Sequence, residues 1–146
     1  MTIWIKTVTP KMLNERSHNT LNDLMGIRIT EIGENYLTGE MPVDHRTRQP
    51  MGILHGGASV VLAESLGSLG SYLAIEPDKG CVGIEINANH VHSKTSGWVT
   101  GTARPLHIGQ STHIWDIRIT DENRQLICIA RLTTAIINKP VQTNEP

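Results

Sequence analysis

One stretch of the chain is apolar enough to predict a buried helix. Leucine and valine dominate the segment that begins after Gly56-Gly57 and ends near Ala74. These side chains fall on nearly every side of a helix, which is typical of a helix surrounded by other elements. It is the one long helical pattern in the sequence, so we expect it to form the centre of the fold.

Most of the remaining sequence has the character of strands. In residues 113–120 the apolar Trp115 and the polar Asp116 belong to two alternating faces. Shorter helices, capped by Thr9 and Thr20, are expected near the start of the chain. The expected strands cover residues 27–32, 36–43, 81–90, 98–103, 113–120 and 126–137. One central helix with a run of antiparallel strands is an α+β pattern, in which a curved sheet can wrap the helix.

Composition limits the chain to one globular domain. It has 146 residues, of which 38% are hydrophobic and 18% charged, as in chains that fold around a core of their own. We expect residues 1–138 to form that domain, and the polar residues 139–146 to form a flexible C-terminal tail. The net charge is −1 and no basic cluster is present, so we do not expect nucleic acid as a partner.

The sequence predicts a cytoplasmic protein with no membrane partner. Its first residues lack the apolar core of a signal peptide, and no window is long enough to span a bilayer. The two cysteines, Cys81 and Cys128, lack the spacing of metal ligands. We expect both to be reduced strand residues, as is usual in a cytosolic protein.

The seven histidines raise the alternative of a metal protein. His90 and His92 would share a face if a strand continues through them, and His55, His107 and His113 could cluster. Metal sites usually show definite ligand spacing and support from carboxylates or cysteines. These histidines have neither, so we expect no metal.

Gly56 and Gly57 mark the point where a loop becomes the long helix. Glycine lets the backbone approach a ligand closely, and the first N–H groups of a helix have no partner within it. The helix dipole also favours negative charge there, such as the charge that develops on a thioester carbonyl under attack. The alternative is an ordinary helix start in which glycine serves only tight packing.

Glu64 is a single carboxylate in an apolar part of the helix, and Ser68 shares its face one turn later. A carboxylate enclosed by apolar residues needs either a basic partner or a chemical purpose. Gly56 and Glu64 are eight positions apart, which is roughly 12 Å along a helix. One chain cannot bring both to the same carbonyl, so Glu64 would have to act from a second, antiparallel subunit.

Three segments, residues 49–68, 85–90 and 104–109, are similar to the bacterial hot-dog thioesterases that act on aromatic acyl groups. The similarity covers nearly the whole chain. It implies a hot-dog fold, in which an antiparallel sheet wraps one long central helix. It also implies an enzyme that hydrolyses acyl-CoA or acyl-carrier-protein thioesters, with acyl groups such as hydroxybenzoyl or 1,4-dihydroxy-2-naphthoyl.

The resemblance assigns roles to individual residues. The Gly56 N–H would polarise the thioester carbonyl, and Glu64 of a neighbouring subunit would be the nucleophile or the general base. The catalytic residues that it implies are Glu64, His55, Gly56 and Gln49. The substrate-binding residues are Ser68, His90, Leu69, His92 and Lys94, of which Lys94 would replace a cation that relatives carry directly after His90. The family is a dimer of dimers, so we expect a homodimer or homotetramer with sites at the subunit interface.

Two other functions stay open at this point. One is a non-catalytic module that binds acyl thioesters, although the presence of Glu64 disfavours it. The other is a broad-range thioesterase for medium and long acyl chains. The sequence does not decide between coenzyme A and a carrier protein, or between direct attack by Glu64 and attack by water. We expect no cofactor besides the coenzyme A of the substrate.

Overall fold

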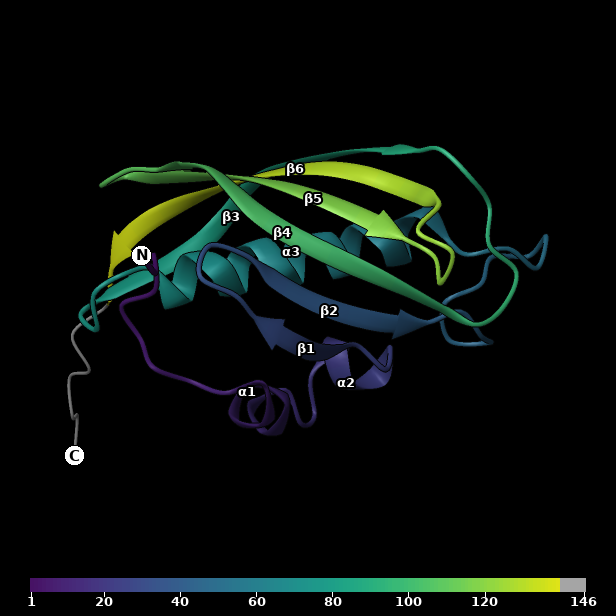
Figure 1. The fold of residues 1–146 in the computed structure, drawn as a ribbon, viewed down its shortest axis with the longest axis horizontal. Helices are drawn as coiled ribbons and strands as arrows, with labels where there is room; N and C mark the ends of the chain where they lie inside the picture. The colour runs from purple at the N-terminus through teal and green to yellow at the C-terminus, as the bar shows by residue number, and fades with distance from the viewer. Residues whose placement is uncertain (140–146) are drawn as a thin grey trace, which may run out of the picture.

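A curved antiparallel sheet wraps around one long helix (Figure 1). The computed structural model describes residues 1–139, which form six strands and three helices. The strands pair in the order β1-β2-β4-β5-β6-β3, and each pair is antiparallel. The elements are α1 (Pro10–Arg16), α2 (Leu21–Leu24), β1 (Arg28–Ile32), β2 (Leu37–Pro42), α3 (Gly56–Leu73), β3 (Lys79–His90), β4 (Trp98–Ile108), β5 (Thr112–Thr120) and β6 (Leu126–Asn138). The α+β class predicted from the sequence is confirmed.

The N-terminal helix α1 is docked on the edge of the sheet. The hydroxyl of Thr9 caps it by accepting from the Met12 N–H, as predicted. Asn14 then joins α1 to β1, because its amide donates to the Ile29 carbonyl at 2.9 Å and its carbonyl accepts from the Ile29 N–H at 2.7 Å. The last turn of α1, which contains Arg16, is thereby fixed beside the central helix.

The core lies between the sheet and one face of α3. Leu62, Leu66 and Leu73 of α3 are completely buried there, as is Trp115 of β5. Complete burial of a leucine contributes about 1.5–3 kcal/mol to stability. The alternation predicted in residues 113–120 is confirmed, since every second side chain is buried and the others are not.

A buried polar cluster joins the second half of α3 to the sheet. The hydroxyl of Ser71 accepts from the Trp115 Nε1–H at 2.8 Å. It also lies 2.7 Å from the Thr134 Oγ1 and 3.1 Å from the His113 Nδ1. All four side chains are buried, and burial lowers the pKa of His113. Burial therefore favours the neutral imidazole in this cluster.

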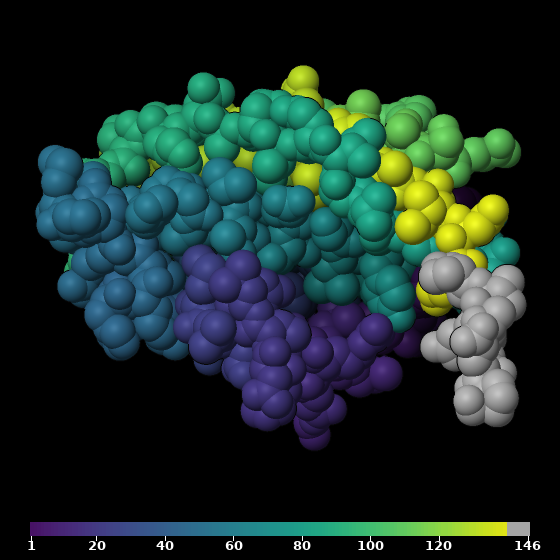
Figure 2. Space-filling view, turned by 180° about the vertical axis from the view of Figure 1, so that it is seen from behind, coloured from purple at the N-terminus to yellow at the C-terminus, as the bar shows by residue number. Residues whose placement is uncertain are grey.

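The prediction that α3 is enclosed on nearly every side is wrong for the single chain. Val60, Glu64, Ser68 and Leu69 are only half-buried. Figure 2 shows this part of α3 at the surface, between β3 on one side and the α1–α2 segment on the other. The physical reason is that one curved sheet covers only one side of a helix, so an apolar opposite face needs a further partner.

The strand β3 forms one edge of the sheet. It is 12 residues long and pairs with β6 alone among the described strands. Val82 and Ile84 on it are exposed by 47% and 59%. A long edge strand with exposed apolar side chains is a template for pairing with another chain. The open face of α3 borders this same edge.

The strand β4 is longer than predicted. The expected strand stops at Ala103, two residues before Pro105. In the structure the pairing of β4 with β5 continues to Ile108, and the register shifts between Pro105 and His107. The irregularity accommodates the proline without ending the strand.

The structure also bears on the cysteines, on membrane-spanning helices and on the first residue of the expected tail. Cys81 and Cys128 are free thiols, as predicted. No helix within residues 1–139 is both long and apolar enough to cross a membrane. Lys139, the first residue of the predicted tail, donates from its Nζ to the Pro77 carbonyl at 2.7 Å. Residues 140–146 of that tail lie outside the described part of the chain.

Candidate active site

The start of α3 presents a free backbone donor. His55 is the N-cap residue, and its Nδ1 accepts from the Gly57 N–H at 2.8 Å. The preceding donor, the Gly56 N–H, has no acceptor within residues 1–139. This N–H therefore combines an unfilled hydrogen bond with the positive end of the helix dipole. His55 thus caps the helix and holds its first turn in place.

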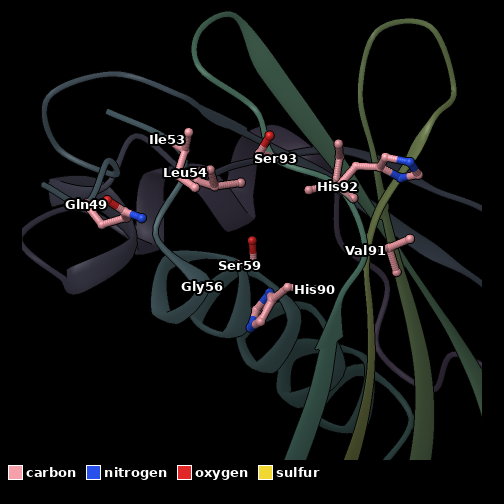
Figure 3. A pocket seen from close by; sticks show the side chains of 10 residues that line it. Gln49, Ile53, Leu54, Gly56, Ser59, His90, Val91, His92 and Ser93 are labelled. Atoms are coloured by element: carbon pink, nitrogen blue, oxygen red, sulfur yellow. The ribbon is translucent and has the colours of Figure 1, made fainter. Parts of the chain in front are cut away.

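A cavity of about 300 Å³ opens in front of this donor. Gln49, Gly56, Ser59, His90 and His92 are among the residues that line it (Figure 3). They come from the loop before α3, from the first turns of α3 and from the end of β3 with the residues that follow. The cavity thus collects four of the predicted site residues, Gln49, Gly56, His90 and His92, within one chain.

His90 is packed directly against Gly56. A Cβ atom at position 56 would lie 2.8 Å from the His90 Nε2 and 3.0 Å from its Cε1. No other residue type fits there unless the imidazole moves. Glycine is therefore required for the close approach of β3 to the start of α3, and not only for access of a ligand.

Gln49 is oriented by its own loop. Its Oε1 accepts from the Met51 N–H, while its backbone N–H donates to the Ile53 carbonyl at 2.9 Å. Because the amide oxygen is occupied, the amide NH₂ is the group left to face the cavity (Figure 3). Gln49 therefore presents a second donor group to the cavity beside Gly56.

Ser59 also lines the cavity, although the sequence did not single it out. It is only 1% exposed, and its hydroxyl points into the cavity (Figure 3). Its sequence signal is weak, because a serine three positions after Gly56 in an apolar helix usually bonds to its own backbone. The cavity is lined by both apolar and polar side chains, and no lining residue carries a carboxylate.

Glu64 lies on the open face of α3, two turns beyond the cavity. Its Oε1 is 2.6 Å from the place where a Cβ of Gly83 on β3 would be, so it lies along the exposed edge of the sheet. The expectation that the chain itself encloses Glu64 is wrong, because the side is open. Within residues 1–139 it forms no ion pair or hydrogen bond, so the alternative of pairing with arginine or lysine finds no support there.

Comparison with known proteins identifies the family. The sequence profile of the thioesterase superfamily matches residues 51–128, which contain both Gly56 and Glu64. The chain belongs to the thioesterase superfamily. The resemblance stated from the sequence is confirmed by this match and by the relatives described next.

Two relatives have specific names. This thioesterase is 49% identical over 135 residues to the 1,4-dihydroxy-2-naphthoyl-CoA hydrolase of Escherichia coli, covering 92% of this chain and 99% of that protein. It is 44% identical over 135 residues to the proofreading thioesterase EntH of Cronobacter turicensis, covering 92% and 98%. The prediction of a thioester hydrolase is confirmed at the level of the family.

A solved structure supports the fold. The crystal structure of a thioesterase from Haemophilus influenzae superposes with a TM-score of 0.94 at 43% identity, covering 99% of this chain and 100% of that one. The hot-dog fold predicted for this thioesterase is therefore confirmed. The long helix α3 and the curved sheet of Figure 1 are the elements of that fold.

The other predicted substrate residues of this thioesterase lie apart from the first cavity. Ser68 and Leu69 line a second cavity, of about 490 Å³, between α3 and the α1–α2 segment. The Lys94 ammonium lies 2.5 Å from a Glu122 carboxylate oxygen, and Lys94 does not line either cavity. That bond lowers the pKa of Glu122 to about 2. Lys94 is thus already neutralised by a neighbouring carboxylate.

His92 lies at the first cavity, and the histidines as a group bear on the alternative of a metal site. The His92 Nδ1 lies 2.9 Å from the Leu126 carbonyl, which fixes the ring at the rim of the first cavity. Within residues 1–139, no three histidine, cysteine, aspartate or glutamate side chains are grouped as metal ligands would be. The histidines of this thioesterase are instead divided between the first cavity, the buried cluster of Ser71 and the surface.

Proposed function

We propose that this thioesterase hydrolyses aromatic acyl-CoA thioesters at a site shared by two copies of the chain. The observation that carries the proposal is the unfilled Gly56 N–H at the mouth of a cavity that the Gln49 amide and the Ser59 hydroxyl also line. Such donors stabilise the negative charge that a thioester carbonyl acquires under attack. Coenzyme A enters as part of the substrate, and the proposal requires no resident cofactor.

The first step is polarisation of the carbonyl. Its oxygen accepts from the Gly56 N–H and from the Gln49 amide, and the dipole of α3 adds to both. Removing one donor of this kind from other hydrolases costs about 10²–10³ in turnover. His90, packed on Gly56, is placed to contact the acyl group or to hold water beside the carbonyl carbon.

The second step is attack, with Glu64 of the other copy as the base or the nucleophile. As base, Glu64 takes a proton from a water that adds to the carbonyl carbon. As nucleophile, it forms an anhydride that water then opens. In both routes the carbon–sulfur bond breaks, the thiolate of coenzyme A leaves and takes up a proton, and the acyl group ends as a carboxylic acid.

The shared site follows from the distance between the two groups. Gly56 and Glu64 lie on the same helix, eight residues and roughly 12 Å apart. The open face of α3 and the free edge of β3 adjoin each other. Antiparallel pairing of two β3 edges would cover Val82 and Ile84 and would set the two α3 helices antiparallel. Such a dimer is the smallest assembly that supplies Glu64 to the cavity of Gly56.

The preference for aromatic groups rests on chemistry and on a relative. Ser68 and His90 offer polar contacts to a ring hydroxyl, and a site built to bond a hydroxyl discriminates strongly against analogues that lack it. The relative from Escherichia coli is named for a dihydroxynaphthoyl substrate. A broad-range thioesterase with an apolar pocket is the second candidate, since leucines also line the second cavity.

The test is a comparison of acyl groups under one set of conditions. We expect kcat/KM for 4-hydroxybenzoyl-CoA and benzoyl-CoA to exceed that for hexanoyl-CoA and lauroyl-CoA. Faster cleavage of either straight-chain substrate would refute the aromatic assignment and favour the broad-range enzyme. Binding of all four without any hydrolysis would instead identify a non-catalytic module. The same acyl groups on a carrier protein would decide which carrier is used.

A further inference from the structure

The second cavity begins beside Glu64 and extends along α3. Ser65, Ser68 and Tyr72 of α3 line it, and Ser68 is one turn from Glu64. Cys81 of β3 lines it too, two residues before Gly83, against which the Glu64 carboxylate lies. Tyr72 marks the far end, roughly 12 Å from Glu64 along the helix axis. An acyl group whose carbonyl is attacked by this Glu64 therefore has a cavity in which to lie.

The far end of the second cavity is held rigid by two cations. The Arg16 guanidinium donates to the Tyr72 hydroxyl at 2.8 Å and lies 4.9 Å from the centre of its ring. The Lys6 Nζ is 4.5 Å from the same ring centre and donates to the carbonyls of Tyr72 and Ile75, at 2.7 Å and 2.5 Å. Tyr72 therefore cannot rotate away without losing both contacts.

The far end of the second cavity carries the positive charge of Arg16, and most of the hydrogen-bond donors of Arg16 have no acceptor in the described part of the chain. Arg16 is the one charged residue that lines the cavity, and it forms no ion pair within residues 1–139. A guanidinium has five N–H donors, of which the structure shows one in use. The hydrogen bond from Arg16 also lowers the pKa of the Tyr72 phenol. Both observations describe a place that favours an oxygen acceptor, above all an anionic one.

We infer that Arg16 and Tyr72 bind an oxygen substituent carried by the acyl group at its end remote from the thioester. The substituent is a phenolic hydroxyl or a carboxylate, and the guanidinium supplies the donors. This inference rests on the proposed function, because it takes Glu64 as the point of attack. It makes Arg16, a residue outside the predicted site, the determinant of which acyl groups are preferred.

The test uses three substrates that differ only at the far end: 2-naphthoyl-CoA, 6-hydroxy-2-naphthoyl-CoA and 6-carboxy-2-naphthoyl-CoA. In the wild type we expect kcat/KM to rise from the first to the third, by about fivefold, as for a charge pair near the surface. Arg16→Met should reduce this ratio to about one. Arg16→Lys should keep part of the preference for the carboxylate, because the charge remains while the planar donor geometry is lost.

Lys11→Met is the matched control. Lys11 lies on the same helix as Arg16, is 85% exposed in its side chain and pairs with Glu15 at 3.9 Å. Its removal changes the net charge by the same amount without touching the second cavity, so the substrate ratio should stay as in the wild type. An equal loss for all three substrates in Arg16→Met, or no preference in the wild type, would overturn the inference.

A binding measurement separates this inference from the proposed function. If the wild type cleaves none of the three substrates, the proposed function fails, and calorimetry with the free acids still decides the inference. Naphthalene-2,6-dicarboxylate should then bind more tightly than 2-naphthoate to the wild type and equally to Arg16→Met. Equal binding of the two acids to the wild type would refute a role for Arg16 in recognition.

Discussion

The two faces of α3 differ in what covers them. On the face toward the sheet, Leu62 and Leu66 are completely buried, and Ser71 is bonded within a buried cluster. On the opposite face, Glu64 and Ser68 are half-buried, and no described residue bonds to the Glu64 carboxylate. Apolar residues occur on both faces of the helix, yet the single chain fully covers only the face toward the sheet.

Because of this difference, we expect the closed face to determine the stability of the chain and the open face to determine its catalytic activity. Substitutions on the closed face should change the free energy of unfolding, because contacts there are made within the chain. Substitutions on the open face should change turnover and leave the fold of the chain largely intact. The first cavity is intermediate, since its donors are assembled within one chain while the proposed function takes its attacking group from a second copy.

The largest effect is expected for Glu64→Gln. The change removes a carboxylate that no lining residue of the first cavity can replace. General base catalysis is worth ~10²–10⁴-fold, and nucleophilic catalysis is worth more. We therefore expect kcat for benzoyl-CoA to fall by at least about 10²-fold, while circular dichroism and Tm stay close to the wild type. Steady-state hydrolysis and thermal melting are the measurements.

A carboxylate on the surface provides the control. Glu76 follows α3 directly and is exposed, and Glu76→Gln makes the same chemical change outside both cavities. It should retain wild-type turnover. If folded Glu64→Gln kept more than about a tenth of the wild-type kcat, Glu64 would be removed from the mechanism and the open face would lose its catalytic assignment.

Complementation is the next effect in size. Gly56→Pro removes the N–H donor at a helix position that tolerates proline, and Glu64→Ala removes the carboxylate. Each variant alone should be inactive. After the two are unfolded and refolded together in equal amounts, half of the dimers are mixed, and one of the two sites in each mixed dimer is intact. The expected recovery is about a quarter of the wild-type activity.

The double variant carrying both changes on one chain supplies the control, because mixing it with inactive Glu64→Ala cannot rebuild a site with both groups. Light scattering on the wild type should show a dimer or a tetramer. A fully active monomer, or the absence of recovery in the mixture when both variants refold, would show that the open face is not completed by a second copy.

The fold could be predicted well because its signals are local. The helix expected after Gly56-Gly57 is α3, and the alternation of residues 113–120 gave both faces of β5 correctly. The errors have physical causes. The strand expected to end at Ala103 continues to Ile108 through a register shift beside Pro105, which local alternation does not show. The apolar face of α3 suggested enclosure, although periodicity cannot distinguish burial within a chain from burial between chains.

The site could be predicted only in part. A helix start with glycine and a single carboxylate are visible in the sequence, so Gly56 and Glu64 could be singled out as candidates. The contact of His90 with Gly56 depends on the curvature of β3, and no local pattern encodes it. Ser59 and Arg16 were missed because serine in a helix and arginine in its last turn are ordinary residues until the cavities beside them are known.

A smaller loss of activity is expected for Gly56→Ala. The new Cβ would lie 2.8 Å from the His90 Nε2, so the imidazole must move while the helix keeps a good helix-forming residue. We expect kcat/KM to fall about tenfold to a hundredfold, corresponding to ~1.4–2.7 kcal/mol, without loss of stability. The same measurements on Gly80→Ala provide the control, because a Cβ there makes only ordinary contacts, the nearest at 3.5 Å.

A double-mutant cycle shows how Gly56→Ala acts. If its effect passes through displacement of His90, the change should cost much less in a His90→Ala background than in the wild type. Additive effects of the two substitutions would mean that the methyl group blocks the substrate directly. Either result keeps Gly56 in the site, but only non-additivity places His90 in the same cavity during turnover.

The smallest effect is expected on the closed face and appears in stability instead of turnover. His113 is 1% exposed and contacts Ser71, and burial lowers its pKa in the folded protein. The unfolded chain takes up the proton near pH 6.5, so it binds more protons than the folded chain just below that value. The stability that the neutral His113 provides is present above about pH 6.5 and declines as the pH falls toward the folded pKa.

The pH dependence of unfolding measures this contribution. His113→Gln should lower the free energy of unfolding at neutral pH and should flatten its slope below about pH 6.5, by at most about 1.4 kcal/mol per pH unit. His18→Gln is the control, because it makes the same substitution at a side chain that is 76% accessible, and it should leave the free energy of unfolding at neutral pH close to that of the wild type. Urea denaturation between pH 5 and 8, in ~0.5-unit steps that resolve this window, gives the slopes. An unchanged slope in His113→Gln would mean that the imidazole is protonated equally in both states, and the closed face would then hold no titrating group.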